Sequence, residues 1–300
     1  MKILISGSSG LVGSDLCAFL VHQGHDVYKL VRHKAKIDSK SIYWDPELKE
    51  LNPALLEGFD AVINLAGENI AAKRWTKAQK QLLRDSRINS TRLLSETLAK
   101  LSSKPKVFVS ASAIGFYGDR PSEMLHEGAM PSKGDYLSDL CQDWEAAASV
   151  AKDAGIRVVH PRFGVILSPK GGAMSKLLTP FKLGAGGIIG NGKQVMSWIA
   201  LDDVIYALNY VLMNEAIIGP VNFTSPNSAT NSEFTKALAK VLSRPAIFPL
   251  PSFAAKLILG EMADALLLSS TKAKPVALLE AGFKFSYANL EEALRHLLRK

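Results

Sequence analysis

The chain begins MKILISGSSGLVG, and residues 2–13 contain the pattern that indicates the fold most clearly. The run KILISG (Lys2–Gly7) is short and apolar, as is typical of a strand buried in a parallel sheet. Glycines follow at positions 7, 10 and 13, and a helical pattern runs from about Gly10 to His22. This order predicts a strand, a tight turn and a crossover helix, the first half of a βαβ unit.

The alternation of apolar runs and amphipathic segments continues down the chain. Strands are expected at 26–32, 61–67, 106–112 and 157–167, and helices at 73–101 and 136–155. Continuous apolar strands separated by helices indicate a parallel sheet that is covered on both faces. We therefore expect an α/β fold with a doubly wound parallel sheet.

The pattern changes after Leu167. Seven of the 22 glycines fall in residues 171–194, which show little strand or helix periodicity and are interpreted as a functional loop. A helix at 202–214, a strand at 219–225 and a helix at 230–244 follow. Thr230 or Asn231 is the expected cap of the last helix, and Asp202 and Asp203 are expected to cap the first. We divide the chain into a main domain, 1–246, with a glycine-rich substrate loop at 168–200, and a small helical C-terminal subdomain, 247–300.

Composition narrows the class of protein. The chain is 47% hydrophobic and 21% charged, and its two cysteines lack metal-ligand spacing, so we expect a reduced, cytoplasmic protein with no metal site and no membrane partner. The net charge of +8 suggests anionic partners. A basic stripe recurs at helical spacing at Lys73, Lys77, Lys80, Arg84 and Arg87. We interpret it as a solvated helix face rather than a nucleic-acid surface.

The glycine cluster has the features of a dinucleotide site. Gly7 would permit the tight turn, Gly10 would let the backbone approach a pyrophosphate, and Gly13 would let the helix pack closely. The helix N-terminus offers unpaired N–H groups and the positive end of its dipole to phosphate.

The end of the second strand indicates which dinucleotide binds. An acidic residue at the carboxyl end would bind a ribose diol, whereas a basic residue accepts a 2′-phosphate. Asp26 lies at the wrong end of the strand, and the carboxyl end reads Arg32, His33, Lys34. The planar guanidinium of Arg32 can pair with phosphate or stack on adenine. We therefore predict NADP(H) rather than NAD(H). The run AVINLAGENI adds Leu65, Ala66 and Gly67 at the same edge, either as a close approach to the cofactor or as a tight turn.

These motifs together resemble the extended short-chain dehydrogenase/reductase superfamily, and more closely its atypical "epimerase family protein" branch with a short C-terminal helical domain. The resemblance rests on GSSGLVG, NLAGENI, SRINSTRLL (86–94), SASAIGFYG (110–118), CQDWEAAA (141–148), SWIALDDV (197–204) and PLPSFAAKLILGE (249–261). It implies NADP as cofactor, with contacts from Arg32, Leu65, Ala66 and Arg87. The complete set of expected cofactor-binding residues is Gly7, Ser9, Gly10, Leu11, Val12, Gly13, Arg32, Leu65, Ala66, Gly67, Arg87 and Ser110.

The resemblance fails at the catalytic residues. The superfamily uses a Tyr, a Lys four residues later and a Ser, because carbonyl reduction needs a proton donor whose pKa the Lys lowers. None of the seven tyrosines here has Lys at that spacing. Tyr136 occupies the superfamily's Tyr position, with Leu140 in place of the Lys, and Ser112 occupies roughly the Ser position. Ser112 and Tyr136 are therefore the candidate catalytic residues, although Ser112 could equally be a turn residue.

The sequence leaves two functions open. The first is an NADP(H)-dependent oxidoreductase or epimerase that acts on a small molecule with a non-standard proton donor. The stretch GNGKQVMSW (190–198) indicates a substrate more apolar or smaller than a nucleotide sugar. The alternative is a non-catalytic NADP-binding sensor or regulator, which the missing Tyr–Lys pair favours.

Overall fold

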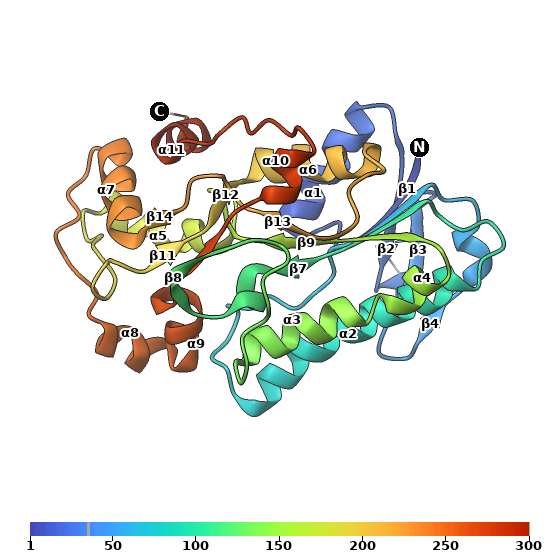
Figure 1. Ribbon diagram of the computed structural model, residues 1–300, viewed down its shortest axis with the longest axis horizontal. Helices are drawn as coiled ribbons and strands as arrows, with labels where there is room; N and C mark the ends of the chain where they lie inside the picture. The colour runs from blue at the N-terminus through green and yellow to red at the C-terminus, as the bar shows by residue number, and fades with distance from the viewer. Residues whose placement is uncertain (35–36, 300) are drawn as a thin grey trace.

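The computed structural model describes residues 1–34 and 37–299, and its centre is a twisted, mostly parallel sheet (Figure 1). The strand order is β13-β9-β6-β5-β1-β2-β3-β4, and all neighbours are parallel except β3 and β4. The bounds are β1 Lys2–Ser6, β2 Asp26–Val31, β3 Ser41–Asp45, β4 Glu50–Leu51, β5 Ala61–Asn64, β6 Val107–Ser110, β9 Arg157–Phe163 and β13 Gly219–Phe223. The strand order reverses at β1, which pairs with both β2 and β5.

Helices cover both faces of the sheet (Figure 1). On one face, α1 (Leu11–His22) and α6 (Leu201–Met213) bury Leu16, Leu20 and Leu208 against β1, β5 and β6. On the other, α2 (Lys77–Ala99) and α4 (Ser149–Asp153) bury Leu94 and other side chains against the same strands. This confirms the predicted doubly wound α/β fold.

Two of the expected elements differ in the structure, and one strand was not expected. The helix expected at 136–155 is two helices, α3 (Tyr136–Ala146) and α4, with no helix-breaking residue between them. The strand expected at 157–167 ends at Phe163, and β10 (Val165–Leu167) pairs instead with β12 (Trp198–Ala200). The break falls at Gly164, where a Cβ would lie 2.6 Å from the carbonyl oxygen of Ser197. The short strand β3 was not expected, because its alternating Ile42 and Trp44 are bounded by polar residues.

The expected substrate loop 168–200 contains a helix, so its interpretation as irregular chain was wrong over residues 172–182. It contains α5 (Gly172–Lys182), which buries Met174, Leu178 and Phe181 at helical spacing. Pro180 lies inside this helix and masks its periodicity. The strand β11 (Val195–Met196) then pairs with β14 (Ala229–Thr230), which leads into α7 (Asn231–Leu242). Thr230 caps α7 in a capping box with Glu233, one of the two caps expected.

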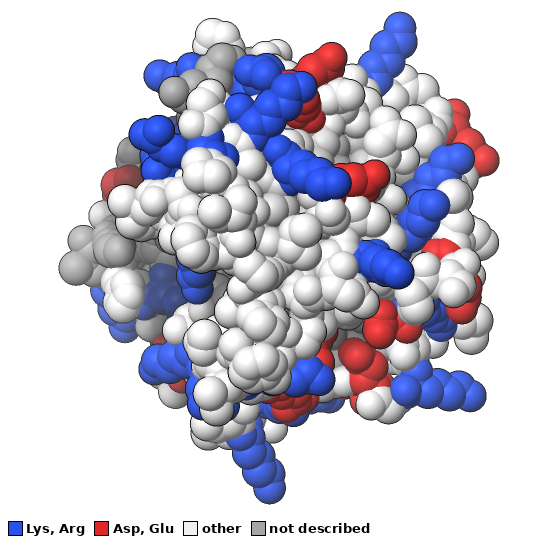
Figure 2. Space-filling view, turned by 90° about the vertical axis from the view of Figure 1, so that its left-hand side faces the viewer, with Lys and Arg blue, Asp and Glu red and all other residues white. Residues whose placement is uncertain are grey.

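The C-terminal segment is mostly helical and lies along one end of the sheet (Figure 1). It comprises α8 (Ser252–Leu259), α9 (Glu261–Ala263), a π-turn at Asp264–Leu268, β15 (Thr271–Ala273), α10 (Val276–Glu280) and α11 (Leu290–Leu298). It joins the main domain through β15, which pairs with β8 (Arg120–Leu125). Figure 2 shows the face on which α7 and α8 lie, where a broad uncharged area has charged residues around it. Phe253, Leu257 and Ile258 of α8 are exposed large apolar side chains.

Candidate functional site

The glycine turn between β1 and α1 is closely packed against its own backbone. Gly7 has φ +68°, and a Cβ there would lie 2.6 Å from the carbonyl oxygen of Leu65. A Cβ on Gly13 would lie 2.2 Å from the carbonyl oxygen of Gly7. Both positions therefore require glycine. The turn lies at the carboxyl ends of β1 and β5, where the strand order reverses and open α/β sheets bind ligands.

The N-terminus of α1 is suited to an anion. Gly10 is the N-cap and supplies no side-chain acceptor, so the first N–H groups of the helix, from Leu11 onward, have no cap within the described chain. Gly10 N–H itself donates to the Gly7 carbonyl at 3.0 Å, which closes the turn. The free N–H groups and the helix dipole favour a phosphate at this position.

A buried polar network holds the carboxyl end of β5 beside this turn. Ser6 Oγ donates to Asn64 Oδ1 at 2.5 Å, and Asn64 Nδ2 donates to Thr91 Oγ1 at 2.8 Å. Trp144 Nε1 donates to the same Thr91 oxygen at 3.0 Å. The network ties β1, β5, α2 and α3 together. This network was not predicted from the sequence, since its members are far apart in the chain. Only Asn64 belongs to a motif that was singled out there, NLAG.

Arg87 reaches the same edge from α2. Its guanidinium donates to the carbonyls of Leu83 and Glu68, both at 3.0 Å, and lies over the ring of Trp144. A Cβ on Gly67 would lie 3.4 Å from the Arg87 side chain, so the glycine leaves room for it. Burial lowers the pKa of this guanidinium. Arg87 thus positions the Gly67–Glu68 loop and places a positive charge at the carboxyl edge.

The end of β2 carries the expected base and no acid. Arg32 directly follows Val31, the last residue of β2, and is exposed at the carboxyl edge of the sheet. Asp26 begins the same strand, where it forms an ion pair with Lys40. The two side chains lie at opposite edges of the sheet because Asp26 begins β2 and Arg32 follows its last residue.

Ser110 ends β6 with an unusual environment. Its side chain is fully buried, and its Oγ has no hydrogen-bond partner among the described residues. A buried hydroxyl without a partner is costly in free energy. An unsatisfied polar atom at the carboxyl end of a central strand fits a site that a bound dinucleotide would complete.

Ser112, the first candidate catalytic residue, belongs to a buried ion-pair network. Its Oγ donates to Glu145 Oε1 at 2.7 Å, and Arg162 binds both oxygens of that carboxylate at 2.8 and 2.9 Å. Arg162 Nη1 also donates to Tyr117 Oη at 2.9 Å, and Tyr117 donates to Asn222 Oδ1 at 2.7 Å. Ser112 is therefore anchored as part of the packing between α3 and β9.

Tyr136, the second candidate, is the first residue of α3. Its hydroxyl donates to the carbonyl of Lys80 at 2.8 Å, and its ring contacts Trp75 edge to face with centroids 5.3 Å apart. Burial raises the pKa of Tyr136, against the opposing effect of Arg87 and Arg84. Leu140 is 3% exposed, so the position that holds the Lys in the superfamily is an apolar packing position here. No hydrogen bond within the described residues joins Tyr136 to Ser112.

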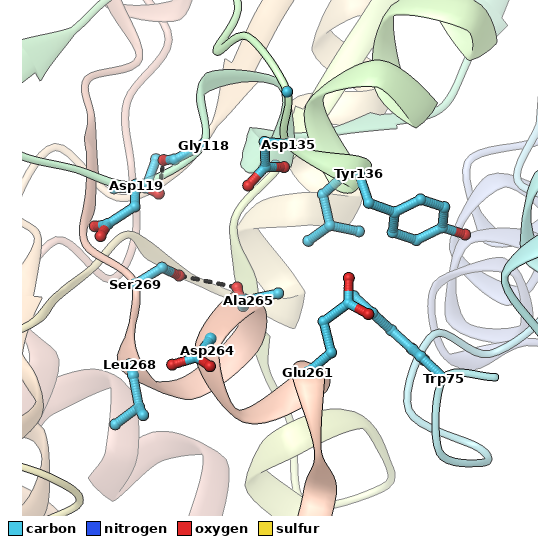
Figure 3. Close-up of a pocket in the computed structure, with 14 residues that line it drawn as sticks. Trp75, Gly118, Asp119, Asp135, Tyr136, Glu261, Asp264, Ala265, Leu268 and Ser269 are labelled. Carbon is cyan, nitrogen blue, oxygen red and sulfur yellow. Dashed lines mark hydrogen bonds between the residues drawn. The ribbon is translucent and has the colours of Figure 1, made fainter. Parts of the chain in front are cut away.

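A cavity of about 290 Å³ lies beside Tyr136 (Figure 3). One side is formed by Trp75, the loop at 115–119 and the start of α3, and the other by residues 261–271 of the C-terminal segment. The carboxylates of Asp135 and Glu261 project toward this space from opposite sides (Figure 3).

The basic stripe on α2 is not uniformly solvated, contrary to expectation. Lys80 pairs with Glu261, Arg84 pairs with Asp143, and Arg87 is held by two carbonyls. Lys77, at the start of the helix, is exposed. Three of the five cations therefore bind α3, the β5 loop or the C-terminal segment.

The expected caps of α6 also have another role. Its N-cap is Ala200, with no side-chain hydrogen bond. Asp203 instead accepts from the N–H groups of Ser286 and Tyr287, at 2.8 and 3.0 Å, and Asp202 pairs with His296. The two aspartates fasten the C-terminal segment to the main domain.

The sheet order and the glycine turn at the strand reversal define a Rossmann-type short-chain dehydrogenase/reductase fold. Residues 3–222 match the model of the NAD dependent epimerase/dehydratase family, and residues 250–297 match a domain of unknown function, DUF1731. The chain belongs to this family, as its motifs predicted.

Similar proteins span the whole chain. An epimerase family protein of Mycobacterium tuberculosis is 42% identical, and the match covers 97% of this chain and 96% of that protein. YfhF of Bacillus subtilis is 37% identical over 99% of this chain and 98% of its own. The crystal structure of human epimerase family protein SDR39U1 with NADPH is 34% identical, covers 100% of both chains and has a TM-score of 0.93.

Two further properties apply to the described residues. No helix there has the length and apolar character needed to span a bilayer. No group of three or more His, Cys, Asp or Glu side chains there is arranged to hold a metal ion.

Proposed function

We propose that the protein binds NADP(H) at the carboxyl ends of β1, β2 and β5 and transfers hydride to or from a small molecule. The packing of Gly7, Gly10 and Gly13 carries this proposal, because it leaves the N-terminus of α1 open to a diphosphate. The human relative of known structure was crystallised with NADPH, which supports the same cofactor here.

Different residues around the turn would bind different parts of the dinucleotide. Gly7, Ser9, Gly10, Leu11, Val12 and Gly13 would hold the diphosphate, and Arg32 would bind the 2′-phosphate. The dinucleotide would also contact four residues near the carboxyl end of β5, namely Leu65, Ala66, Gly67 and Arg87. Ser110 would give its unpaired hydroxyl to the nicotinamide half. NADP(H) supplies the hydride chemistry, whereas the chain orients the cofactor and moves the proton.

Tyr136 is the proposed proton donor. As a phenol with a raised pKa it is protonated at neutral pH, as a donor must be. Its hydroxyl would exchange the Lys80 carbonyl for a substrate oxygen. Ser112 would act by positioning, since its hydroxyl is bound to Glu145.

Binding and turnover are tested separately. We expect NADPH to quench intrinsic fluorescence with a lower Kd than NADH, and comparable or tighter binding of NADH would reject the cofactor assignment. With a panel of carbonyl compounds, NADPH oxidation by the wild type and its loss in Tyr136→Phe, with NADPH binding unchanged, would support the proton-donor role. Unchanged turnover in Tyr136→Phe would reject it.

A non-catalytic NADP sensor is the second candidate, favoured by Leu140 and by the bond between Tyr136 and a backbone carbonyl. It predicts tight NADPH binding, no oxidation across the panel and a partner protein whose capture depends on NADPH. Turnover of any panel compound at a rate that depends on Tyr136 would exclude it.

A further inference from the structure

The cavity beside Tyr136 has the dimensions of a site for a small molecule. Its volume of about 290 Å³ is at the lower end of the roughly 300–1,000 Å³ typical of ligand pockets. Tyr136 and Trp75 form part of its wall, with the Tyr136 hydroxyl on the side away from Asp119 and Asp264 (Figure 3).

The C-terminal segment builds the opposite wall and is held there by specific contacts. Ser270 N–H donates to Asp119 Oδ1 at 2.7 Å, and Thr271 Oγ1 donates to the Gly118 carbonyl at 2.9 Å. Arg120 N–H donates to the Ser270 carbonyl at 2.7 Å. The segment that matches a domain of unknown function therefore supplies six of the 14 residues that line the cavity.

The charges around the cavity are unbalanced. Four carboxylates line it, those of Asp119, Asp135, Glu261 and Asp264, and no Lys or Arg is among its described lining residues. Glu261 pairs with Lys80 and Asp264 pairs with Lys256.

The other two carboxylates form no ion pair with a described side chain. Asp119 and Asp135 accept only backbone N–H groups within the described chain, from Ser270 and Ser138 respectively. An anionic diphosphate would meet like charge here and be repelled, whereas a cation would be attracted.

Aromatic rings supply an independent reason to expect a cation. Trp75 and Tyr136 lie edge to face on one wall. Ring faces attract ammonium groups through their quadrupole, and recognition of cationic ligands commonly relies on them. The Tyr136 ring already has such a partner, since the Lys80 ammonium lies 4.8 Å from its centroid. Trp75 forms no cation–π contact among the described residues, so its ring is the one available to a cationic ligand.

We propose that this cavity is the substrate site and takes a small molecule that carries a protonated amine, with Asp119 and Asp135 selecting for that charge. The inference rests on the proposed function, because it places the substrate against the side of the cavity that contains Tyr136, the proposed proton donor. It assigns to residues 261–271 the role of completing the cavity wall, and it disfavours a nucleotide sugar as substrate.

Three probes of one size test the charge preference. Cyclohexylamine, cyclohexanol and cyclohexanecarboxylate are titrated into the full-length protein with NADP⁺ present, followed by ligand-observed NMR, and UDP-glucose serves as a fourth probe. Cyclohexylamine should bind at least about tenfold more tightly than the carboxylate, as expected for one attractive against one repulsive charge at short range.

The double variant Asp119→Asn, Asp135→Asn should reduce this preference to about twofold or less. Both amides can still accept the backbone N–H groups that the aspartates bind, and Asn is a good N-cap for α3. The matched control is Glu47→Gln, Glu96→Gln, which removes the same charge from exposed positions and should leave the preference unchanged. The two single variants cover the case in which the double variant does not fold.

Several results would overturn the proposal. These are tighter binding of the carboxylate or of UDP-glucose than of the amine, equal reduction of the preference in the control, or no binding of any probe. NADP⁺ affinity is measured in the same samples. If the wild-type protein prefers the amine but does not bind NADP⁺, the proposed function is rejected and the cation site is supported. The two failures are therefore distinguishable.

Discussion

The carbonyl oxygen of Gly7 lies 2.2 Å from the point that a Cβ on Gly13 would occupy. No side chain fits between them, so the last glycine of the cluster is required by the preceding turn of the backbone. Gly10 is less constrained, because a Cβ there would lie 3.2 Å from the same oxygen.

The two positions should therefore respond differently to alanine. Gly13→Ala should destabilise the fold by roughly 1–3 kcal/mol or more, as overpacking does, and should abolish NADPH binding. Gly10→Ala should cost less than about 1 kcal/mol and should still weaken NADPH binding, because the methyl group obstructs the approach of the diphosphate. Urea unfolding and NADPH fluorescence measure the two effects, and equal stability losses would contradict the packing argument.

Arg32 should determine the choice of dinucleotide. Arg32→Gln should weaken NADPH binding about tenfold or more, since a hydrogen bond to a charged group contributes roughly 1.5–3 kcal/mol, and should change NADH binding little. Arg92→Gln, on the exposed side of α2, is the matched control. A parallel loss of affinity for both dinucleotides would show that Arg32 does not bind the 2′-phosphate.

The ion pair between Arg162 and Glu145 should be important for stability. Arg162 is 3% exposed, so Glu145→Gln would leave a buried guanidinium without its carboxylate. Removing one partner of a buried pair costs about 3–5 kcal/mol. Chemical unfolding should show a loss of that order, compared with less than about 1 kcal/mol for Glu123→Gln in the exposed Arg120 pair. A small loss at Glu145 would mean that water replaces the carboxylate.

His160 should make the protein sensitive to acid. Burial lowers the pKa of this imidazole below its usual 6.5. As the pH falls through the unfolded value, the unfolded chain binds a proton that the folded chain does not, so the stability is present above about pH 6.5 and declines below it.

The variant His160→Gln should lose less stability than the wild type between pH 7 and pH 5. His33→Gln, at an exposed position, should behave as the wild type does. Unfolding curves at the two pH values give the comparison, and an unchanged pH dependence in His160→Gln would show that other groups cause the acid sensitivity.

Much of the fold was readable from local pattern. Apolar runs marked β1, β2, β5, β6 and β9, and the residues that follow them reached the carboxyl edge as expected. Arg32 was placed by this rule, since parallel strands bring their ends to one edge. The helix α5 was not predicted, because a proline and six flanking glycines hide its periodicity. The strand β3 was not predicted either, and it buries only two side chains, Ile42 and Trp44.

The site depended more on long-range packing. Asp202 and Asp203 have the sequence position of helix caps, yet they bind the C-terminal segment more than 80 residues away. Tyr136 and Ser112 were chosen by resemblance, and their hydrogen bonds lead to different partners, Lys80 and Glu145.

The sequence by itself determined the sheet, the glycine turn and the basic end of β2, because each follows from periodicity or conformational freedom within a few residues. Only the tertiary structure decided how the α2 cations are paired, which group accepts the hydrogen bond of the Tyr136 hydroxyl, and which carboxylates line the cavity. These features are formed by side chains that are distant in sequence, and no local pattern specifies which of them fold against one another.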